Sequence, residues 1–405
     1  MENHEETKVD LKDRVVGQSN TTEEPAVQVR SLKELLDRVT GRDVKTQRLP
    51  EESGLAEILP FPFLALVGQP EMKLALLLSL INPAIGGVLL IGPRGTGKTT
   101  AVRSLTELLP EVPRSLCYYG CLPEDIESGG QNAVCPDCAR KFAEGEQLFK
   151  MDKVRLVELP LNAGLEDVIG GVDERAAIQN RFRMHKGLLA QADHNILYVD
   201  EVNLLQDEVV DALLDAAAQG KYTVRRGPIA ATYHSRFVLI GSMNPEEGNL
   251  RPQILDRFGL RVIVRGLEAH EERLEAYRRV QSYIAQPRHI VEQFSLETEI
   301  AQAEIQAARN ILPEVKLTDE VANDGLRLIS DLHVDSLRAE ITLFEAARAH
   351  AAGDNRYTVT HEDLRVVAPM ALRLRRSKFI KEFFELQNSE DAELSVMLES
   401  VISTT

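Results

Sequence analysis

The stretch that decides the fold is GVLLIGPRGTGKTTAV, residues 87–102. An apolar run typical of a buried strand leads directly into GPRGTGKT, which matches G-x-x-x-x-G-K-[ST] in full, and a helical pattern follows it. In a loop of this type the glycines let backbone N–H groups curl around phosphate oxygens, Lys98 reaches the outer phosphates and Thr99 binds Mg²⁺. Strand, loop and helix occur in the order that the motif requires, so the sequence predicts a nucleotide-binding P-loop.

A pair of carboxylates completes such a site. ILYVDE, residues 196–201, is an apolar strand pattern that ends in Asp200 and Glu201. Asp200 is expected to hold the Mg²⁺ of MgATP through its water shell, together with Thr99, and Glu201 to polarise the attacking water. A strand that ends in Asp-Glu is weak evidence alone, but beside a P-loop it predicts ATP hydrolysis. The residues expected to bind the nucleotide are Val67 and Gly68, near the adenine, and Gly92, Pro93, Arg94, Gly95, Thr96, Gly97, Lys98, Thr99 and Thr100.

Apolar periodicity divides the chain into three parts. Residues 1–58 are predicted to be an N-terminal extension, largely disordered, with a short amphipathic helix near 31–39. Residues 59–268 alternate strand and helix patterns, which predicts an α/β domain with a parallel sheet flanked by helices. Residues 269–405 contain only helical patterns and are predicted to form a separate all-helical domain. The basic run at 373–378 near its end is expected to be a solvated helix end.

Composition narrows the class of protein. The chain has 405 residues, 43% of them apolar, and a formal net charge of -16. No apolar run reaches the roughly 20 residues that a membrane-spanning helix needs, and the polar, acidic start does not resemble a signal peptide, so a cytoplasmic location is expected. The negative charge makes nucleic acid an unlikely partner, because binding to phosphate backbones needs basic patches.

All four cysteines lie in one stretch, CYYGCLPEDIESGGQNAVCPDC, residues 117–138. Clustered cysteines in a reducing compartment more often indicate a metal site than disulfides. The pairs Cys117/Cys121 and Cys135/Cys138 have the spacing of a four-thiolate structural zinc site. An iron–sulfur cluster, a thioredoxin-responsive dithiol and four free thiols remain the alternatives.

The P-loop and ILYVDE, followed by FVLIGSMNPEEGNLRPQILDRFGL at 237–260, resemble the AAA+ ATPases, and within them the I subunits of magnesium chelatases. The resemblance covers roughly residues 60 to 380. It implies a P-loop AAA+ fold with a four-cysteine insertion at 115–140, a helix-2 insert at 159–195 and a β-hairpin at 221–236. Two departures are Met243, where family members have a small residue, and a hairpin less charged than is usual.

The resemblance also assigns roles to residues outside the two nucleotide motifs. Asn244 is similar to sensor 1, which holds the attacking water or the γ-phosphate. Arg257 resembles the arginine finger that reaches a neighbouring subunit's nucleotide, and Arg338, in DSLRAEIT, resembles sensor 2. The expected catalytic set is therefore Lys98, Glu201, Asn244, Arg257 and Arg338. An arginine placed at the γ-phosphoryl oxygens would stabilise the charge that develops there.

As a whole, the resemblance implies a ring motor, hexameric in the expected form, that uses ATP and Mg²⁺. It implies a D-type subunit and a large porphyrin-binding subunit as partners. The implied reaction is Mg²⁺ insertion into protoporphyrin IX, in chlorophyll or bacteriochlorophyll biosynthesis. Two alternatives are the motor of another tetrapyrrole chelatase, such as one for cobalt, and a MoxR-like chaperone for cofactor insertion. A DNA motor is disfavoured by the net charge and by the lack of basic residues in the hairpin beyond Arg225 and Arg226.

Overall fold

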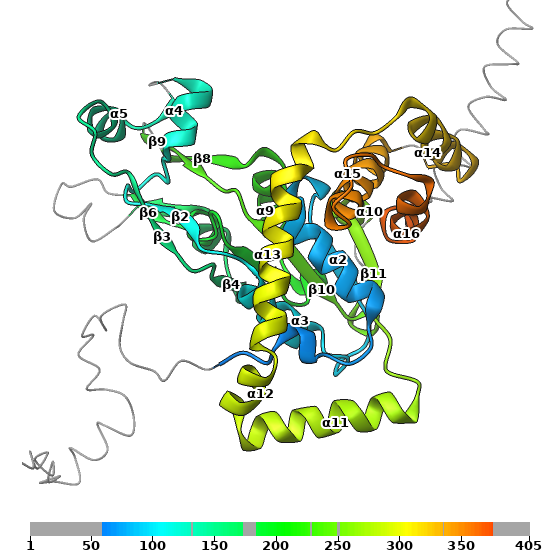
Figure 1. Ribbon diagram of the computed structural model, residues 1–405. Helices are drawn as coiled ribbons and strands as arrows, with labels where there is room; N and C mark the ends of the chain where they lie inside the picture. The colour runs from blue at the N-terminus through cyan, green and yellow to red at the C-terminus, as the bar shows by residue number, and fades with distance from the viewer. Residues whose placement is uncertain are drawn as a thin grey trace, which may run out of the picture. The chain divides into compact units, whose positions relative to one another are not determined.

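The computed structural model describes residues 59–130, 133–172, 184–226, 229–248, 252–334 and 336–375 (Figure 1). The predicted N-terminal extension with its helix near 31–39, the middle of the helix-2 insert, the hairpin turn and the residues after 375 therefore lie outside the described parts. No helix within the described ranges is long and apolar enough to cross a membrane.

A five-stranded parallel sheet forms the centre of the described chain, in the order β11-β1-β10-β7-β4. The predicted parallel sheet is thus confirmed, including the strand that leads into the P-loop. The edge strand β11 was not predicted, because its short apolar run is interrupted by an arginine. The strands are β1 (Val88–Ile91), β4 (Leu156–Leu159), β7 (Ile196–Val199), β10 (Val238–Met243) and β11 (Leu260–Ile263).

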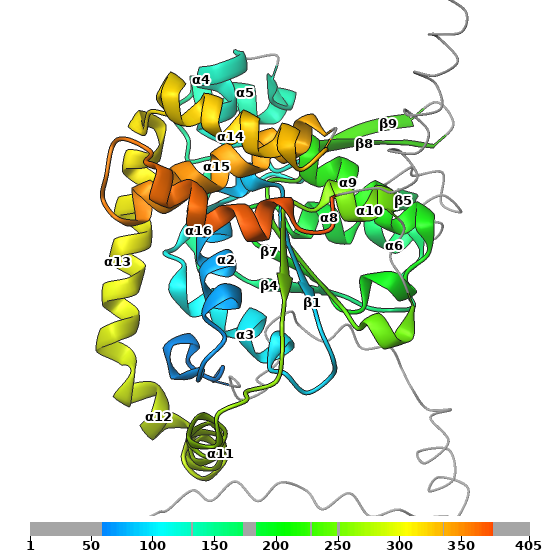
Figure 2. The same cartoon turned by 90° about the vertical axis from the view of Figure 1, so that its right-hand side faces the viewer.

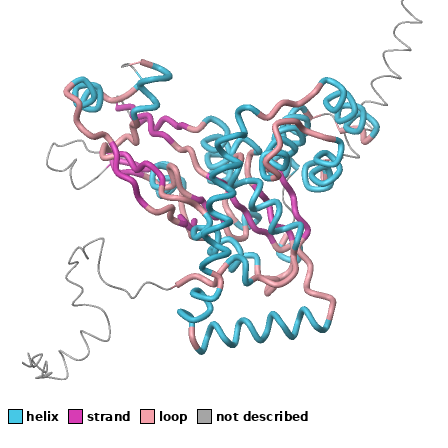
Figure 3. The backbone as a smooth tube through the Cα atoms, viewed as in Figure 1, coloured by secondary structure: helices cyan, strands magenta, loops and turns pink. Residues whose placement is uncertain are grey.

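In the described part of the chain, three two-stranded ribbons lie outside this sheet. One joins β2 (Val112–Ser115) to β3 (Phe149–Asp152) and carries the cysteine segment in its connection. A second pairs β5 (Gly170–Val172) with β6 (Met184–Lys186), inside the range of the expected helix-2 insert. The third is the hairpin of β8 (Lys221–Arg226) and β9 (Ile229–His234). In Figure 3 the first and third ribbons extend from the central strands toward the same end of the molecule.

Helices cover both faces of the sheet (Figure 2). On each buried strand alternate side chains enter opposite clusters: Leu90 and Ile240 join one, Leu89 and Leu239 the other. The first cluster includes side chains from α2 (Pro70–Ile81), α3 (Lys98–Ser104), α13 (Ser295–Ile311), α14 (Asp319–Asp331), α15 (Leu337–Gly353) and α16 (His361–Leu372). The second includes side chains from α6 (Leu165–Ile169), α8 (Leu188–Gln191), α9 (Asp207–Gln219) and α10 (Pro252–Arg257).

The C-terminal helices share their core with the α/β part. Leu343 and Ala346 of α15 belong to the same buried cluster as Leu76 of α2 and Leu90 of β1. Two helices that follow β11, α11 (His270–Ala285) and α12 (Pro287–Gln293), contribute little to it. The helical region is therefore distinct in sequence, but within the described residues its core is continuous with that of the sheet.

Arg373 and Arg375, the described arginines of the basic run after α16, are held by contacts within the fold rather than solvated, which corrects the sequence prediction for these two residues; Arg376 and Lys378 lie outside the described residues. The side chain of Arg375 is fully buried; it donates to Asp256 Oδ1 at 2.7 Å and to the carbonyl oxygen of Gly259 at 3.1 Å. Arg373 pairs with Glu71 of α2. Arg261 of β11 is also fully buried, and it donates to the carbonyl oxygen of Arg373 at 2.8 Å. Burial, together with the neighbouring positive charge of Arg375, lowers the pKa of Arg261 to about 9.

Glu107 lies where the α/β part meets α13. It belongs to the 3-10 turn η3 (Leu105–Leu108), and the side-chain amide of Gln302 in α13 donates to its carbonyl oxygen. Burial raises the pKa of the Glu107 carboxyl from 4.5 to about 7. A raised pKa means that the folded state favours the protonated form. The contribution of this group to stability is therefore complete below pH 4.5 and is lost as the pH rises through about 7.

We therefore predict that Glu107→Gln increases the free energy of unfolding relative to the wild type above about pH 7, because the amide carries no charge to bury. The difference should widen between about pH 5 and pH 7 and then stay constant. Thermal unfolding of both proteins across this range measures it, with the exposed Glu111→Gln as the control. A difference that does not change with pH would contradict the assignment.

Candidate active site

The P-loop joins β1 to α3, as the sequence predicts. Gly95 and Gly97 have φ angles of 77° and 84°, in the left-handed region that favours glycine. Gly92 has no room for a side chain, because an added Cβ would lie 2.1 Å from the carbonyl oxygen of Val264. The glycines are thus required both by the turn and by the packing of the loop against the segment after β11.

Lys98 begins α3 and is buried. Its Nζ donates to the carbonyl oxygens of Gly92 at 2.8 Å and Pro93 at 2.7 Å, so the ammonium lies inside the curve of the loop. Burial lowers the pKa of Lys98, and the carboxylates of Asp200 and Glu201 partly oppose that shift. The loop therefore carries a buried cation that faces the carboxylates across the site.

The two expected magnesium ligands lie in one hydrogen-bonded network. The Thr99 hydroxyl is 3.1 Å from the hydroxyl of Tyr198, which lies 2.9 Å from Asp200 Oδ1. Ser242 of β10 also donates to Asp200 Oδ1. Burial raises the pKa of Tyr198 to about 12, so its hydroxyl stays protonated at neutral pH. Tyr198 and Ser242 were not identified from the sequence, although both lie on the strands whose ends the prediction used.

Glu201 follows Asp200 in an unusual backbone conformation. Its φ is 51° and its ψ is 55°, the left-handed region that non-glycine residues rarely adopt. Its backbone N–H donates to the Ser242 hydroxyl at 3.2 Å, and its carboxylate pairs with Arg94 of the P-loop at 3.0 Å. Strained residues of this kind cluster at active sites, where the surrounding structure holds them.

Asn244, the expected sensor 1, lies at the end of β10 and is buried. Its Nδ2 donates to Glu247 Oε1 at 3.0 Å, and Glu247 pairs with Arg94 at 2.6 Å. Arg94 therefore links Asn244 and Glu201 through Glu247. The structure brings together Lys98, Thr99, Asp200, Glu201 and Asn244 as predicted, and it adds Glu247, which the NPEEG segment contains but which was not selected.

The two remaining arginines lie elsewhere. Arg257, the last residue of α10, pairs with Asp215 at 2.9 Å and Asp211 at 3.4 Å, both on α9. Arg338, at the start of α15, lies 3.8 Å from Asp256. In both Figure 1 and Figure 2, α10 is well separated from α3 and the P-loop. Arg257 and Arg338 are thus near one another, and within the described residues no ion pair joins either of them to the P-loop.

Val67 and Gly68 lie in the turn before α2. Gly68 has a φ of 65°, and a Cβ added to it would lie 2.5 Å from Leu267. The next residue, Gln69, donates to the carbonyl oxygen of Arg265 at 2.5 Å. The segment after β11 therefore contacts both this turn and Gly92 of the P-loop, so the turn lies on the nucleotide side of the sheet.

The four cysteines form a compact cluster away from the P-loop, near α4 (Pro123–Gly129) and α5 (Pro136–Ala143). Their sulfur atoms all lie within 4.8 Å of one another, and none is in a disulfide. Backbone N–H groups of Tyr119 and Cys121 donate to the Cys117 sulfur, each at 3.3 Å. A hydrogen bond from the Cys121 thiol lowers the pKa of Cys117 to about 4. The cluster thus combines a stabilised thiolate with the spacing of a tetrahedral site.

Comparison with protein families identifies both halves of the fold. Residues 86–244 match an AAA domain and residues 327–395 match an AAA lid domain. A crystal structure of a Cytophaga hutchinsonii protein described as an ATPase shares the fold, with a TM-score of 0.51 at 20% identity over 77% of this chain and 84% of that one. A chain from the complex of BchI and BchD of magnesium chelatase is 39% identical, over 80% of this chain and 99% of its own, with a TM-score of 0.45.

Curated relatives match most of the chain. The magnesium-chelatase subunit ChlI homolog of Methanocaldococcus jannaschii is 42% identical, over 79% of this chain and 87% of its own. The magnesium-chelatase 38 kDa subunit of Acidiphilium rubrum is 41% identical over 78% and 90%, and the chloroplastic ChlI of Nicotiana tabacum 42% over 78% and 74%. Identity at this level across nearly whole relatives places the protein in the family of magnesium-chelatase I subunits, within the AAA+ ATPases.

Proposed function

We propose that this chain is the ATP-hydrolysing motor of a magnesium chelatase, which uses ATP to drive Mg²⁺ insertion into protoporphyrin IX. The observation that carries the proposal is the convergence of Lys98, Thr99, Asp200, Glu201 and Asn244 at one edge of the sheet. Its relatives of about 40% identity are named as magnesium-chelatase subunits, which supports this task over cobalt insertion or a MoxR-like role. We expect the protein to act in the cytoplasm.

The residues at this edge fit MgATP. The curved loop and the buried Lys98 ammonium suit the phosphates, and the two oxygen donors Thr99 and Asp200 bind the same tyrosine hydroxyl, close enough to share one ion's shell. Mg²⁺ in such a site neutralises charge on the phosphates. Glu201 would accept a proton from the attacking water, Asn244 would orient that water, and Tyr198 and Ser242 would hold Asp200 in position.

We infer that Arg257 and Arg338 act on the nucleotide of a neighbouring copy. Both lie on the α10 side of the subunit, apart from its own P-loop, and Asp256 connects them: it precedes Arg257 in the chain and lies 3.8 Å from Arg338. An arginine supplied from outside stabilises the charge of the transferring phosphoryl group. The need for an arginine from a neighbouring copy supports assembly of the subunits into a ring, and the family membership supports a hexamer. A D-type subunit and a large porphyrin-binding subunit are the proposed partners of that ring.

We also propose that Cys117, Cys121, Cys135 and Cys138 hold one structural zinc ion. Zinc–sulfur bonds of about 2.3 Å in a tetrahedron separate the sulfur atoms by about 3.8 Å, which agrees with a cluster whose members all lie within 4.8 Å of one another. A four-iron cluster would spread its thiolates over different irons, further apart. The insertion also has a small core of its own: among the described residues, its buried members are Cys121, Cys138, Ile126 and Leu148, with Val134 packed against them.

The ring is tested by mixing two inactive chains. We predict that Glu201→Gln lowers ATP turnover about a hundredfold or more, and Arg257→Ala about a thousandfold, because each removes a group that acts in the transition state. A mixture should recover activity, since an intact Glu201 then meets an intact Arg257 at some interfaces. The exposed Arg365→Ala is the matched control. No recovery on mixing, with both variants assembled, would rule out action between subunits.

The chelatase task is tested by reconstitution. The purified chain, a D-type subunit and a porphyrin-binding subunit, supplied with ATP, Mg²⁺ and protoporphyrin IX, should form Mg-protoporphyrin, detected by its fluorescence. Replacing Mg²⁺ by Co²⁺ should give little product. An active ATPase that yields no Mg-protoporphyrin would sink the chelatase assignment and leave the ATPase assignment standing.

Metal analysis tests the cysteine cluster. The chain purified without chelator should contain about one zinc ion, and Cys138→Ser should reduce the content below about half, because a closed structural site needs all four ligands. Asp137→Asn, an exposed change between two of the cysteines, should keep one zinc ion. A wild-type protein with less than about half a zinc ion per chain, whose thiols form disulfides on oxidation, would favour redox chemistry instead.

A further inference from the structure

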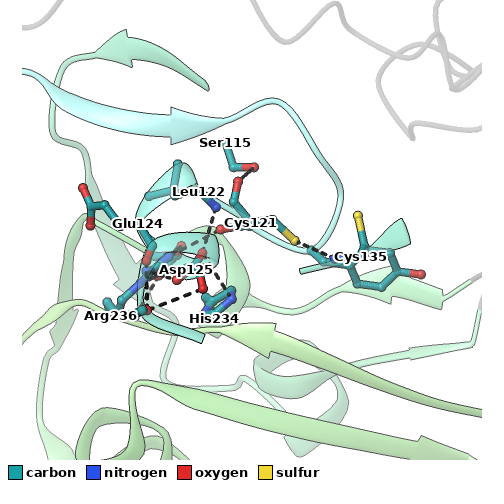
Figure 4. A network of polar contacts seen from close by, with 12 residues as sticks. Ser115, Cys121, Leu122, Glu124, Asp125, Cys135, His234 and Arg236 are labelled. Carbon is teal, nitrogen blue, oxygen red and sulfur yellow. Dashed lines mark hydrogen bonds and ion pairs between the residues drawn. The ribbon is translucent and has the colours of Figure 1, made fainter. Parts of the chain in front are cut away.

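The cysteine insertion is joined to the hairpin β8–β9 by a partly buried ionic contact. Asp125, in the first turn of α4, accepts a hydrogen bond from Arg236 Nη1 at 2.9 Å, and His234 Nε2 lies 3.6 Å from its other oxygen. His234 is the last residue of β9, and Arg236 follows the hairpin. Figure 4 shows Arg236 and His234 converging on Asp125. The exposed fraction of the Asp125 side chain is 12%, so this contact is largely shielded from solvent.

Hydrogen bonds connect the position of Asp125 to the cysteine cluster. The backbone N–H of Leu122, which directly follows Cys121, donates to Asp125 Oδ2 at 2.8 Å. The Cys121 sulfur accepts from the backbone N–H of Cys135, and the Cys121 carbonyl oxygen accepts from Ser115. The position of Asp125 therefore depends on the position of Cys121, which is one of the four thiols of the cluster.

Aromatic rings make a second contact between insertion and hairpin. Tyr119, between the first two cysteines, stacks on Tyr233 of β9 with ring centroids 5.8 Å apart, and Tyr233 stacks on Tyr222 of β8 at 5.6 Å. Tyr118 meets the edge of Tyr233 at 6.2 Å, and Lys186 of β6 lies over the Tyr118 ring. The loop that the first cysteine pair closes thus packs on the base of the hairpin and reaches the helix-2 insert.

Arg236 connects these contacts to the central sheet. Its backbone N–H donates to Asp193 Oδ1 at 2.8 Å, and its carbonyl oxygen accepts from His194. Two residues later the chain enters β10, which is buried along its whole length and is followed directly by Asn244. The junction between hairpin and β10 is therefore held between Asp193 on the body and Asp125 on the cysteine insertion.

We propose that a zinc ion bound by the four cysteines is a clamp: by fixing Asp125 and the Tyr118–Tyr119 loop, it anchors the base of the β8–β9 hairpin to the ATPase body. The inference rests on the zinc assignment proposed above. An insertion with so small a core cannot hold Asp125 in place by apolar packing, whereas metal binding supplies free energy that orders the segment. Loss of the ion should therefore loosen the hairpin as well as the insertion.

Hydrogen exchange of the full-length chain, measured by mass spectrometry, tests the clamp. With zinc bound, amides of 221–226 and 229–234 should exchange slowly. Removal of zinc by a chelator under reducing conditions should accelerate the exchange of these amides by roughly tenfold or more, because that is the change expected when a charge-assisted hydrogen bond to a buried group is lost. Added zinc should restore slow exchange. Amides of β1 should not respond.

Asp125→Asn separates the clamp from the metal site. The amide keeps an oxygen for the Leu122 N–H but loses the charge that faces Arg236 and His234. This variant should retain about one zinc ion per chain, which shows that its cysteine cluster is folded, yet exchange its hairpin amides roughly tenfold faster than the wild type. Asp137→Asn, on the same insertion with a side chain 83% exposed, should behave as the wild type.

The outcomes distinguish the proposals. The clamp would be overturned if the wild type contains zinc but its hairpin amides exchange at the same rate after chelation. It would also be overturned if the Asp125→Asn chain contains zinc and its hairpin amides exchange as slowly as those of the wild type. Either result would leave the zinc site intact. A wild-type chain without zinc would overturn both the metal assignment and the clamp. Neither measurement depends on ATP turnover or on porphyrin, so failure of the chelatase assignment would leave the clamp standing.

Discussion

The parallel pairing of β1, β10 and β7 is the constraint on which the site depends. Ile91 is in register with Met243, and Gly241 with Val199, so the three strands end at the same edge. Adjacent strands lie about 4.8 Å apart, which brings the loops that follow them within reach of one another. The P-loop, Asp200 and Asn244 each follow one of these strands. The chemistry thus depends on a register that apolar side chains on both faces of the sheet hold in place.

The features that local sequence determines were predictable. The P-loop needs glycines at positive φ and a lysine at the start of a helix, and both requirements appear as residue types at fixed spacing. The carboxylates at the end of a buried strand follow the same logic. Asn244, Arg257 and Arg338 were identified through the family resemblance, because a single asparagine or arginine has no distinctive local pattern.

The features that depend on distant contacts were missed. Asp125 and Arg236 are 111 positions apart, and neither has neighbours that indicate the other. The burial of Arg375 could not be inferred either, because a basic run normally lies in solvent. The groups that accept hydrogen bonds from Arg375 come from distant segments, α10 and the residues before β11. Tyr198 illustrates the same limit: an apolar strand accounts for its presence, and only the fold brings its hydroxyl between Thr99 and Asp200.

The continuous core also constrains how the motor moves. A hinge between the sheet and α15 would expose side chains that are fully buried against α2. Exposing them would cost about 25 cal/mol of free energy per Å² of apolar surface. The buried Arg375 and the half-exposed Arg338 both contact Asp256, the residue before Arg257. We therefore expect the C-terminal helices to move together with α2, and any displacement of α15 to change the position of Arg257.

The backbone of Glu201 has a consequence for how this protein can change. The left-handed conformation is unfavourable for a residue with a Cβ, and here it is imposed on the residue whose carboxylate must face the P-loop. A glycine at this position would relax the chain and remove the carboxylate that pairs with Arg94. Sequences selected for stability alone would drift toward that relaxed state, so the persistence of glutamate at position 201 would itself report that hydrolysis is still under selection.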